Sequence, residues 1–358
     1  MYPKGLREST NAFLSAWSKA CTSLEPSTLY VPQGTFLLHI TQFKGPCKSN
    51  SVSIKIYGSL IAPTDYIILG SAPGWIQIHD LEGISIQGGI LDGKGKGLWD
   101  CKGSNKYCPI GTENLGIFNS KDIHITSLTS MNSQKFHINI VGCQNVKLEE
   151  IKTLAPGNSF NTDEIHIQDS SFVSIFRSNI STGDDCISIG PRSNSLWIED
   201  VTCGLGHVSI GSLGEKFEDG GVENITVTGA SFIGTENGVR IKTWGKPSDA
   251  IVKNITFQHV SMVNVYNPII INQNYCTKSE RCGGQPSGIQ IMAITFSDIH
   301  GSSATKTAVK FDCSSIKPCY GLILENIDLS FNGKTAETLC ANAFGKTLGT
   351  VNPPSCLK

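Results

Sequence analysis

A four-residue strand pattern recurs six times in the middle of the chain: HINI at 137–140, EIHI at 164–167, CISI at 186–189, HVSI at 207–210, GVRI at 238–241 and PIII at 268–271. Each copy places apolar residues two positions apart, which is the period of a strand buried on one face. The last isoleucines of successive copies are 27, 22, 21, 31 and 30 residues apart. This near-regular spacing predicts one structural unit that is wound repeatedly along the chain.

A second series of strands alternates with the first. Its apolar pairs are Val146/Leu148, Val173/Ile175, Leu196/Ile198, Ile225/Val227, Ile255/Phe257, Ile294/Phe296 and Leu322/Leu324. The segments between strands are short, rich in Gly, Asn, Ser and Asp, and show no amphipathic helical stretch, which argues against an alternating α/β sheet. We therefore predict an all-β chain that forms one domain over 1–358, a right-handed parallel β-helix, or solenoid.

The open end of such a solenoid needs a cover, because its terminal repeat has no neighbour. A short helix is predicted over 9–24, where Ser9 or Thr10 can act as the N-cap. Its apolar residues share one helical face: Phe13, Ala16, Trp17 and Ala20. This helix is expected to cap the first turn.

Composition excludes several classes of protein. The chain has 358 residues, and 29 Lys and Arg against 30 Asp and Glu give a net charge of −1, which argues against a nucleic-acid partner. No apolar run approaches the ~18 residues needed to cross a membrane. The first ten residues lack the apolar core of a signal peptide, so we infer a mature or trimmed chain whose signal has been removed.

Cysteine usage favours an oxidising compartment. The chain has 13 cysteines, a high number for a reducing environment, and no CxxC pair that would indicate a zinc site. Sequons for N-glycosylation begin at Asn179, Asn224 and Asn254. Together these features predict a secreted glycoprotein with several disulfide bonds.

Stacked turns place residues of equal offset in a ladder on the outer face. One position before the last isoleucine, the ladder is Asn139, His166, Ser188, Ser209, Arg240 and Ile270. Asp163 and Asp185 share another offset in adjacent turns, with Asp184 beside the second of them. A single Asp in such a turn more often satisfies backbone groups. Clustered carboxylates destabilise a protein, however, so the clustering of these three Asp residues indicates a functional site.

The clustered residues have the chemistry of glycoside cleavage. Crowded carboxylates push their pKa values apart, so one can donate a proton while another stays ionised as a base. Carboxyl groups separated by two coil-to-coil steps match the 6.5–9.5 Å carboxyl separation of inverting enzymes better than the ~5 Å separation of retaining enzymes. Arg240 and Lys242 add fixed positive charge that suits a substrate with carboxylates. The predicted substrate is an acidic polysaccharide.

Four motifs occur in order: NTD at 161–163, GDDC at 183–186, GH at 206–207 followed by SIGSLG at 209–214, and RIK at 240–242. This set resembles the signature of the polygalacturonases, the pectin-cleaving glycoside hydrolases, and the resemblance runs from about Ser9 to the C-terminus. The segments LIAPTDY at 60–66 and GLW at 97–99 are most similar to plant enzymes of the pollen type, which are often exo-acting.

The resemblance implies a parallel β-helix, hydrolysis of α-1,4-linked galacturonan with inversion, and no metal or organic cofactor. It implies that Asp184 is the general acid, that Asp163 and Asp185 position the attacking water, and that His207 tunes the proton network. The implied substrate-binding residues are Arg240, Lys242, Tyr275 and Asn161, the last more structural than chemical. We expect a monomeric, secreted cell-wall protein with no nucleic-acid or membrane partner.

Disulfide pairs follow from two sources. The resemblance implies Cys186–Cys203, Cys313–Cys319 and Cys340–Cys356, the last of which would staple a C-terminal tail over 340–358. Spacing suggests Cys21–Cys47, Cys101–Cys108 and Cys276–Cys282. Cys143 then remains outside the pairs, and we expect it to be buried.

Three departures from the family pattern leave an alternative open. Glu164 stands where the family usually has Gly, the loop after His207 is one residue shorter, and residues 1–8 lack the usual opening strand. A displacement of about 1 Å in a catalytic group can lower a rate ~10²-fold. The alternative is a catalytically impaired or non-catalytic pectin-binding homologue. A calcium-dependent pectate lyase is disfavoured, because the motifs are those of the hydrolases.

Overall fold

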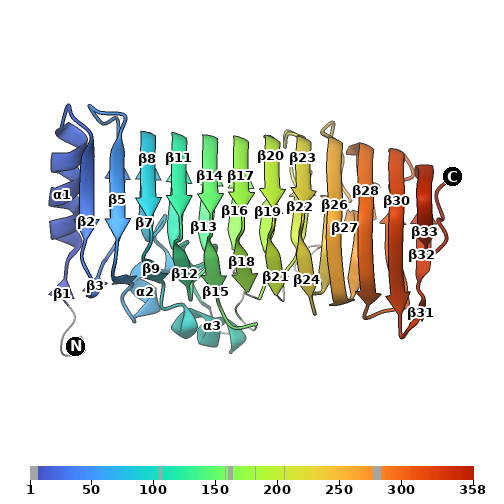
Figure 1. Cartoon of the computed structure of the whole chain (residues 1–358), viewed down its shortest axis with the longest axis horizontal. Helices are drawn as coiled ribbons and strands as arrows, with labels where there is room; N and C mark the ends of the chain where they lie inside the picture. Colours follow the sequence, from blue (N-terminus) through green and yellow to red (C-terminus); the bar gives the residue numbers. More distant parts are fainter. Residues whose placement is uncertain are drawn as a thin grey trace. The chain divides into compact units, whose positions relative to one another are not determined.

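The computed structural model describes residues 7–104, 107–157, 159, 164–181, 183–204, 206–276 and 284–358. The chain divides into two compact units, Met1–His166 with Phe172–Asp184, and Ile167–Ser171 with Asp185–Lys358. Nearly all strands within each unit run parallel and stack coil upon coil (Figure 1). Strands β16 (Ile165–Gln168) and β17 (Ser171–Phe176) contain residues of both units.

Three parallel ladders build the first unit. One ladder is β4 (Thr41–Lys44), β7 (Ile76–His79), β10 (Leu115–Phe118) and β13 (Ile138–Val141). The second is β2 (Ser27–Val31), β5 (Val52–Ile56), β8 (Glu82–Gln87), β11 (Lys121–Thr126) and β14 (Gln144–Glu149). The third is β1 (Arg7–Glu8), β3 (Thr35–Leu37), β6 (Ser59–Ile61), β9 (Ile90–Asp92), β12 (Thr129–Met131), β15 (Lys152–Leu154) and β18 (Asn179–Ser181).

The second unit repeats this arrangement. One ladder is β19 (Ile187–Ile189), β22 (Val208–Leu213), β25 (Asn237–Trp244), β27 (Asn267–Tyr275), β29 (Thr307–Asp312) and β32 (Glu337–Ala341). Another is β20 (Ser193–Glu199), β23 (Val222–Thr228), β26 (Ile251–Val265), β28 (Gln290–Ser303), β30 (Cys319–Phe331) and β33 (Ala343–Asn352). Strand β21 (Thr202–Gly204) pairs with β24 (Ser231–Ile233), and β24 pairs with β26. Strand β31 (Lys334–Thr335) pairs antiparallel with β30.

The repeated isoleucines form the core, as the period-two pattern predicts. Ile189, Ile210, Ile241 and Ile271 are register partners on successive strands, and all four are fully buried. Each such side chain contributes about 1.5–3 kcal/mol by leaving water. Because identical shapes stack at one offset, the interior fills without large gaps. The predicted parallel β-helix is confirmed.

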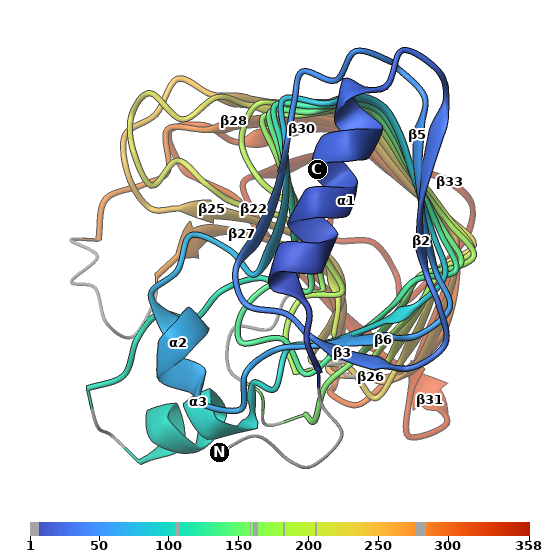
Figure 2. The ribbon, with the colours of Figure 1, turned by 90° about the vertical axis from the view of Figure 1, so that its left-hand side faces the viewer.

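Helix α1 (Thr10–Thr22) lies across the opening of the first coils, as Figure 2 shows. Phe13, Trp17 and Ala20 are buried, and the Trp17 indole N–H donates to the Lys44 carbonyl at 3.2 Å. The predicted cap helix is therefore confirmed, but it is shorter than the predicted range of 9–24. Ser9 is the N-cap and is not helical, and the helix ends at Thr22 because the backbone of Ser23 is extended. The assignment of Ala16 to the buried face is wrong: it lies at the edge of the apolar stripe and is exposed.

Two further helices interrupt the coils of the first unit. Helix α2 (Tyr66–Gly70) begins at Asp65, whose carboxylate accepts from the Ile67 backbone N–H at 3.0 Å. Helix α3 (Lys96–Gly103) buries Leu98 and Trp99. Both helices precede the two strand series from which the absence of helical stretches was inferred, and the sequence analysis did not predict them. Helix α3 is too short for a helical period to stand out and is held by its tertiary contacts.

The cysteine predictions agree with the structure wherever both partners are described. Disulfides join Cys21–Cys47, Cys101–Cys108, Cys186–Cys203, Cys313–Cys319 and Cys340–Cys356. Cys276 is also disulfide-bonded, while its predicted partner Cys282 lies outside the described residues. Cys143 takes no part in a disulfide: it is buried, and its thiol donates to the carbonyls of Ile117 and Val141. Burial raises the pKa of this thiol to about 11, which keeps it protonated.

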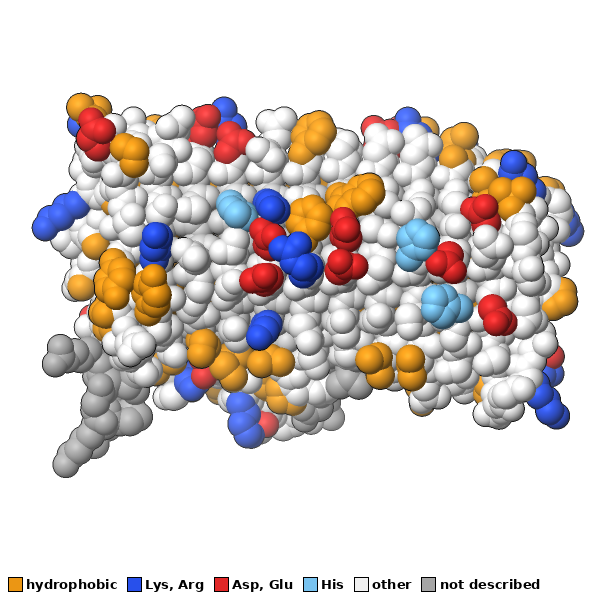
Figure 3. Space-filling model, viewed as in Figure 1, with side chains coloured by type: hydrophobic (Ala, Val, Ile, Leu, Met, Phe, Trp, Pro, Cys, Tyr) orange, Lys and Arg blue, Asp and Glu red, His pale blue; other side chains and the backbone are white. Residues whose placement is uncertain are grey.

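Charged side chains gather on the outer surface over β14 and β17 (Figure 3). The Glu149 carboxylate accepts from Lys147 at 3.0 Å and also contacts Arg177 and His124. These donors, Lys147 foremost, lower the pKa of Glu149 to about 2. The network links the outer face of three successive coils of the first unit.

His137 makes the stability of the first unit sensitive to acid. Its ring is fully buried, with Nδ1 3.0 Å from the Ser130 carbonyl, and burial lowers its pKa to about 3. An unfolded His titrates near 6.5, so the unfolded chain binds the extra proton first. The contribution of neutral His137 is complete above about pH 6.5 and is lost as the pH falls toward about 3.

We expect the His137→Gln variant to lose less stability on acidification than the wild type. Between pH 7 and pH 5, the fall in unfolding free energy should be smaller by about 2 kcal/mol in the variant. Urea denaturation at the two pH values measures both slopes. Equal slopes in the two proteins would contradict a neutral buried His137.

Candidate active site

The predicted outer ladder exists in the second unit. Ser188, Ser209, Arg240 and Ile270 are consecutive register partners on β19, β22, β25 and β27. Parallel pairing with a period of two keeps their side chains on one face of the sheet. The loops before β19 and β22 supply Asp185 and His207 next to this face.

The predicted site residues differ in how far the structure describes them. Asp185, His207, Arg240, Lys242 and Tyr275 all belong to the second unit. Asp184 precedes Asp185 in the chain and is half-buried. Asn161 and Asp163 lie outside the described residues.

Asp185 is the centre of a buried charged cluster. One carboxylate oxygen contacts His207 Nε2, and the other accepts from Lys242 Nζ at 3.0 Å. Asp185 is 2 % exposed and His207 is 7 % exposed. Three successive segments of the chain therefore meet at one carboxylate, and the shorter loop after His207 leaves its contact with Asp185 in place.

Electrostatics keep the Asp185–Lys242 pair charged. Burial alone would raise the pKa of Asp185, but His207 and Lys242 outweigh burial and hold that pKa below its ordinary range. Burial alone would lower the pKa of Lys242, but Asp185 outweighs it and the net pKa is raised. Asp185 is therefore an ionised group that can accept a proton or orient water, and it cannot serve as the acid near neutral pH.

Arg240 and Lys242 lie against the ring of Tyr275. The Arg240 guanidinium carbon and the Lys242 ammonium are each 5.5 Å from the Tyr275 ring centroid. Cations at this distance are attracted by the ring quadrupole. Two positive groups and an aromatic ring thus face one position, which is the arrangement that would hold a sugar carboxylate.

Gly211 allows β22 to approach β25 beneath Lys242. Its φ is +110°, and a Cβ there would lie 2.1 Å from the Lys242 carbonyl oxygen. Any larger residue at Gly211 would displace the strand that carries Lys242. The glycine in the SIGSLG motif therefore has a structural role in positioning the site.

Sequence reasoning missed Trp244. Its ring lies edge-on to Tyr275, with centroids 5.0 Å apart and planes at 73°, and the residue is 4 % exposed. One signal was available: Arg240, Lys242 and Trp244 are two residues apart, the spacing of one strand face. The contact itself depends on a register shift in the pairing of β25 with β27 after Lys242.

Glu164 belongs to the first unit and is fully buried. Its backbone carbonyl accepts from the Ile138 N–H at 2.7 Å. This bulky residue therefore occupies interior space where the family usually has Gly.

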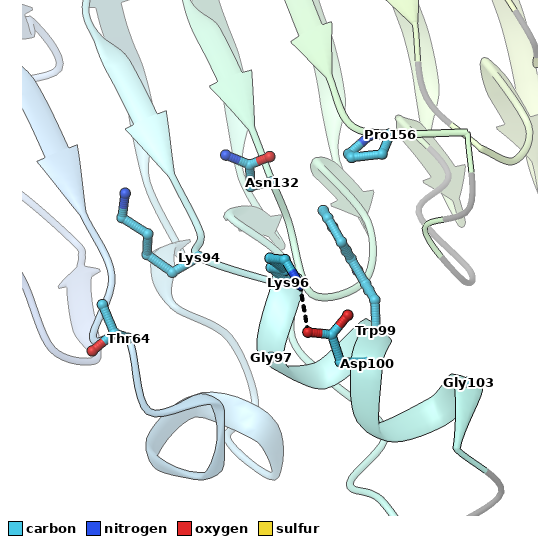
Figure 4. A pocket seen from close by; sticks show the side chains of 9 residues that line it. All are labelled: Thr64, Lys94, Lys96, Gly97, Trp99, Asp100, Gly103, Asn132 and Pro156. Carbon is cyan, nitrogen blue, oxygen red and sulfur yellow. Dashed lines mark hydrogen bonds and ion pairs between the residues drawn. The ribbon is translucent and has the colours of Figure 1, made fainter.

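A hollow of about 720 Å³ lies beside α3 in the first unit (Figure 4). Its lining includes Lys94, Lys96, Trp99, Asp100 and Asn132, and Lys96 pairs with Asp100 at 2.6 Å. Of the predicted site residues that the structure describes, none lines this hollow. Within the described ranges no cluster of His, Cys, Asp and Glu is arranged to hold a metal ion, and no helix there has the length and apolar character of a membrane span.

Comparison with known proteins identifies the family. Residues 21–349 match the model of glycosyl hydrolases family 28. The chain is 52 % identical over 355 residues to a polygalacturonase of Prunus persica, covering 99 % of this chain and 90 % of that protein. It is 38 % identical to an exopolygalacturonase of Oenothera organensis, covering 98 % of each.

Solved structures agree on the fold. An endo-xylogalacturonan hydrolase from Aspergillus tubingensis superposes with a TM-score of 0.85 at 23 % identity, covering 96 % of each chain. A polygalacturonase from Erwinia carotovora ssp. carotovora superposes with a TM-score of 0.71 at 22 % identity, covering 97 % of this chain and 93 % of that one. The resemblance drawn from the four motifs is confirmed, and the chain belongs to glycosyl hydrolase family 28.

Proposed function

We propose that this protein is a polygalacturonase that hydrolyses the α-1,4 bonds of galacturonan with inversion. The observation that carries the proposal is the buried Asp185–His207–Lys242 cluster beside Arg240 and Tyr275 in a family 28 chain. The names of its full-length relatives support the same activity.

Hydrolysis needs one carboxyl group that donates a proton and one carboxylate that activates water. We assign the acid to Asp184, since its neighbour Asp185 is held ionised by His207 and Lys242. Asp185, together with Asp163, positions and deprotonates the attacking water. His207 orients Asp185 through their direct contact.

Substrate selection rests on charge. Arg240 and Lys242 bind the carboxylate of a galacturonate, and Tyr275 supplies a flat surface for the sugar ring. Asn161 is assigned a supporting role next to Asp163 in the same motif. A neutral sugar has no carboxylate to bind Arg240 and Lys242, so neutral polysaccharides are disfavoured as substrates.

The proposal also covers where the enzyme cuts the polymer and where the protein is located. We propose exo-action, supported by relatives named exopolygalacturonase. We also propose a monomer that is secreted to the cell wall. Secretion is supported by the disulfide bonds and by the exposure of all three sequon asparagines, Asn179, Asn224 and Asn254.

A time course on polygalacturonate tests the proposal, with reducing ends and product lengths followed in parallel at mildly acidic pH. Galacturonate monomer from the first time point is the expected result. Mixed oligomers would replace exo-action by endo-action. An unsaturated product lost on chelation would indicate a lyase, and binding without any product would indicate a non-catalytic homologue.

A further inference from the structure

Two tyrosines on the outer face of the first unit contact each other and still face solvent. Tyr30 belongs to β2, Tyr57 follows the last residue of β5, and their ring centroids are 5.3 Å apart with planes at 40°. Tyr30 is 62 % exposed and Tyr57 is 58 % exposed. Figure 3 shows hydrophobic side chains gathered over these two strands. Aromatic rings that gather on a surface, unlike single exposed apolar residues, indicate an interaction site.

The strand pattern holds both rings in this position. Tyr30 lies between the buried Leu29 and Val31 on β2, so the period of two turns its ring outward. Tyr57 follows the buried Ile56 and points outward for the same reason. The Tyr57 backbone N–H donates to the Val31 carbonyl at 2.9 Å, which joins the two coils at the tyrosines. Because a tyrosine side chain has only two χ angles, contact with a ligand costs it little conformational entropy.

A lysine accompanies the two rings. The half-buried Lys55 is the register partner of Tyr30 and lies two residues before Tyr57, so all three side chains share one face. Among the residues that the structure describes, Lys55 has no ion-pair partner, and neither tyrosine hydroxyl has a hydrogen-bond partner. This place therefore offers two flat rings, two hydroxyl groups and one cation to a ligand. A sugar chain that carries carboxylate groups matches this chemistry.

The next coil leaves room beside Tyr57. Strand β8, which pairs with β5, ends at Gln87 and is followed by Gly88 and Gly89. Both glycines have left-handed backbone conformations, with φ of +72° and +86°. Since neither carries a side chain, they do not cover the side of Tyr57 that faces away from Tyr30. An extended ligand can therefore continue past Tyr57 along the ladder.

The size of this patch fits a narrow ligand. A specific interface between two proteins buries about 1,200–2,000 Å² in total. A tyrosine side chain offers at most about 150–250 Å², and part of each ring here is already covered by the other. Two tyrosines and one lysine are thus too few for a stable dimer of this chain. They are enough to contact a few consecutive sugars of a polysaccharide.

We propose that Tyr30, Tyr57 and Lys55 form a second, non-catalytic site that binds a segment of galacturonan. The tyrosine rings contact the faces of the sugars, and Lys55 binds a uronate carboxylate. This inference rests on the proposed function and adds an anchoring site in the first unit, whereas the charged cluster around Asp185 belongs to the second. A polymer held at one site is presented to the other at a raised effective concentration.

Affinity electrophoresis through gels that contain polygalacturonate tests the inference. The Asp184→Asn protein is used as the parent, so that the polymer is not cleaved, and the retardation gives the dissociation constant. We expect Tyr30→Ala combined with Tyr57→Ala to weaken binding of the polymer about tenfold. Lys55→Met should weaken it about threefold at low salt and much less at high salt, because salt screens an exposed charge pair. Tyr30→Phe combined with Tyr57→Phe should keep most of the affinity, since both rings remain.

Two residues of the second unit give matched controls. Tyr266→Ala removes a tyrosine that is 52 % exposed and has no ring contact within the described ranges. Lys346→Met makes the same change in net charge as Lys55→Met, and Lys346 is an exposed lysine without an ion pair in the described part of the chain. Both variants should bind the polymer as tightly as the parent.

Kinetics separate the second site from the catalytic one. In a protein that keeps Asp184, the double alanine variant at Tyr30 and Tyr57 should show a several-fold higher KM for polygalacturonate with kcat unchanged, because the polymer has lost an anchor. Turnover of trigalacturonate should be unchanged, since so short a chain binds at the catalytic site without the second anchor.

The outcomes distinguish this inference from the proposed function. Equal retardation of the double alanine variant and its parent would overturn the inference, and so would a matching loss of trigalacturonate turnover. Equal, tyrosine-dependent retardation in a gel of hydroxyethylcellulose would overturn the acidic ligand. In these cases hydrolysis by the wild type leaves the proposed function standing. Tyrosine-dependent retardation without any hydrolysis by the wild type would overturn the proposed function alone.

Discussion

Replacement of Asp184 by Asn is expected to lower the rate of galacturonan hydrolysis by about 10³-fold, within the 10²–10⁴ range of general acid catalysis. The amide cannot protonate the leaving glycosidic oxygen. Its neighbour Asp185 cannot take over, because His207 and Lys242 keep that carboxylate ionised. Asn has nearly the shape of Asp, so the half-buried position tolerates the change.

Two controls keep this prediction specific. The affinity of the Asp184→Asn variant for galacturonate, which has no glycosidic bond to cleave, should stay within a few-fold of the affinity of its parent, and its circular dichroism should be unchanged. Asp298→Asn removes a carboxylate of the second unit that pairs with His259 on the exposed surface, and it should keep full activity. A loss of less than tenfold for Asp184→Asn would exclude it as the acid.

The second large effect concerns the stability of the Asp185–Lys242 pair. Asp185→Asn removes the carboxylate that pairs with the buried Lys242 ammonium, and Lys242→Met removes the lysine charge from the buried Asp185 carboxylate. Loss of one partner of a buried pair typically destabilises a protein by about 3–5 kcal/mol. The double variant removes both charges, so its loss should be clearly smaller than the combined losses of the single variants.

Urea denaturation of the four proteins measures the coupling. Strictly additive losses would show that the two side chains do not depend on each other. Activity should be lost in all three variants, since Asp185 orients water and Lys242 binds substrate in the proposed mechanism.

The stability from this pair has a defined pH window. The pKa of Asp185 is lowered in the folded state, so its contribution is present above the unfolded value of about 3.9 and is lost as the pH falls through the folded value. The pKa of Lys242 is raised, so its contribution is present below about 10.4 and is lost as the pH rises through the folded value. Mildly acidic conditions lie inside this window.

Much of the fold follows from the sequence because a solenoid turns sequence offset into spatial order. The spacing of the repeated isoleucines predicts which residues become register partners, and Ser188, Ser209 and Arg240 pair as that spacing requires. Stacking of the strands also brings together Asp185, His207 and Lys242, which stand at different offsets from these isoleucines. Regular stacking thus allowed the meeting of these three side chains to be predicted without knowledge of loop conformations.

Irregular features escaped prediction for physical reasons. Pairing of β25 with β27 shifts by one residue after Lys242, so Trp244 lies opposite Tyr275 and not opposite Asn274. A constant offset cannot anticipate that contact, and Tyr275 itself came only from the family resemblance. Helix α3 is likewise set by tertiary contacts of Leu98 and Trp99. These unpredicted features are local. They lie around the Asp185–His207–Lys242 cluster or away from it, and they do not alter the contacts within it.

The most direct test of the account is the proton NMR spectrum of products formed from polygalacturonate in the first minutes of reaction. An inverting hydrolase that uses Asp184 and Asp185 should release saturated galacturonate as the β-anomer before mutarotation, and Asp184→Asn should release almost none. Release of the α-anomer, of unsaturated products, or of no product by the wild type would contradict the proposed mechanism.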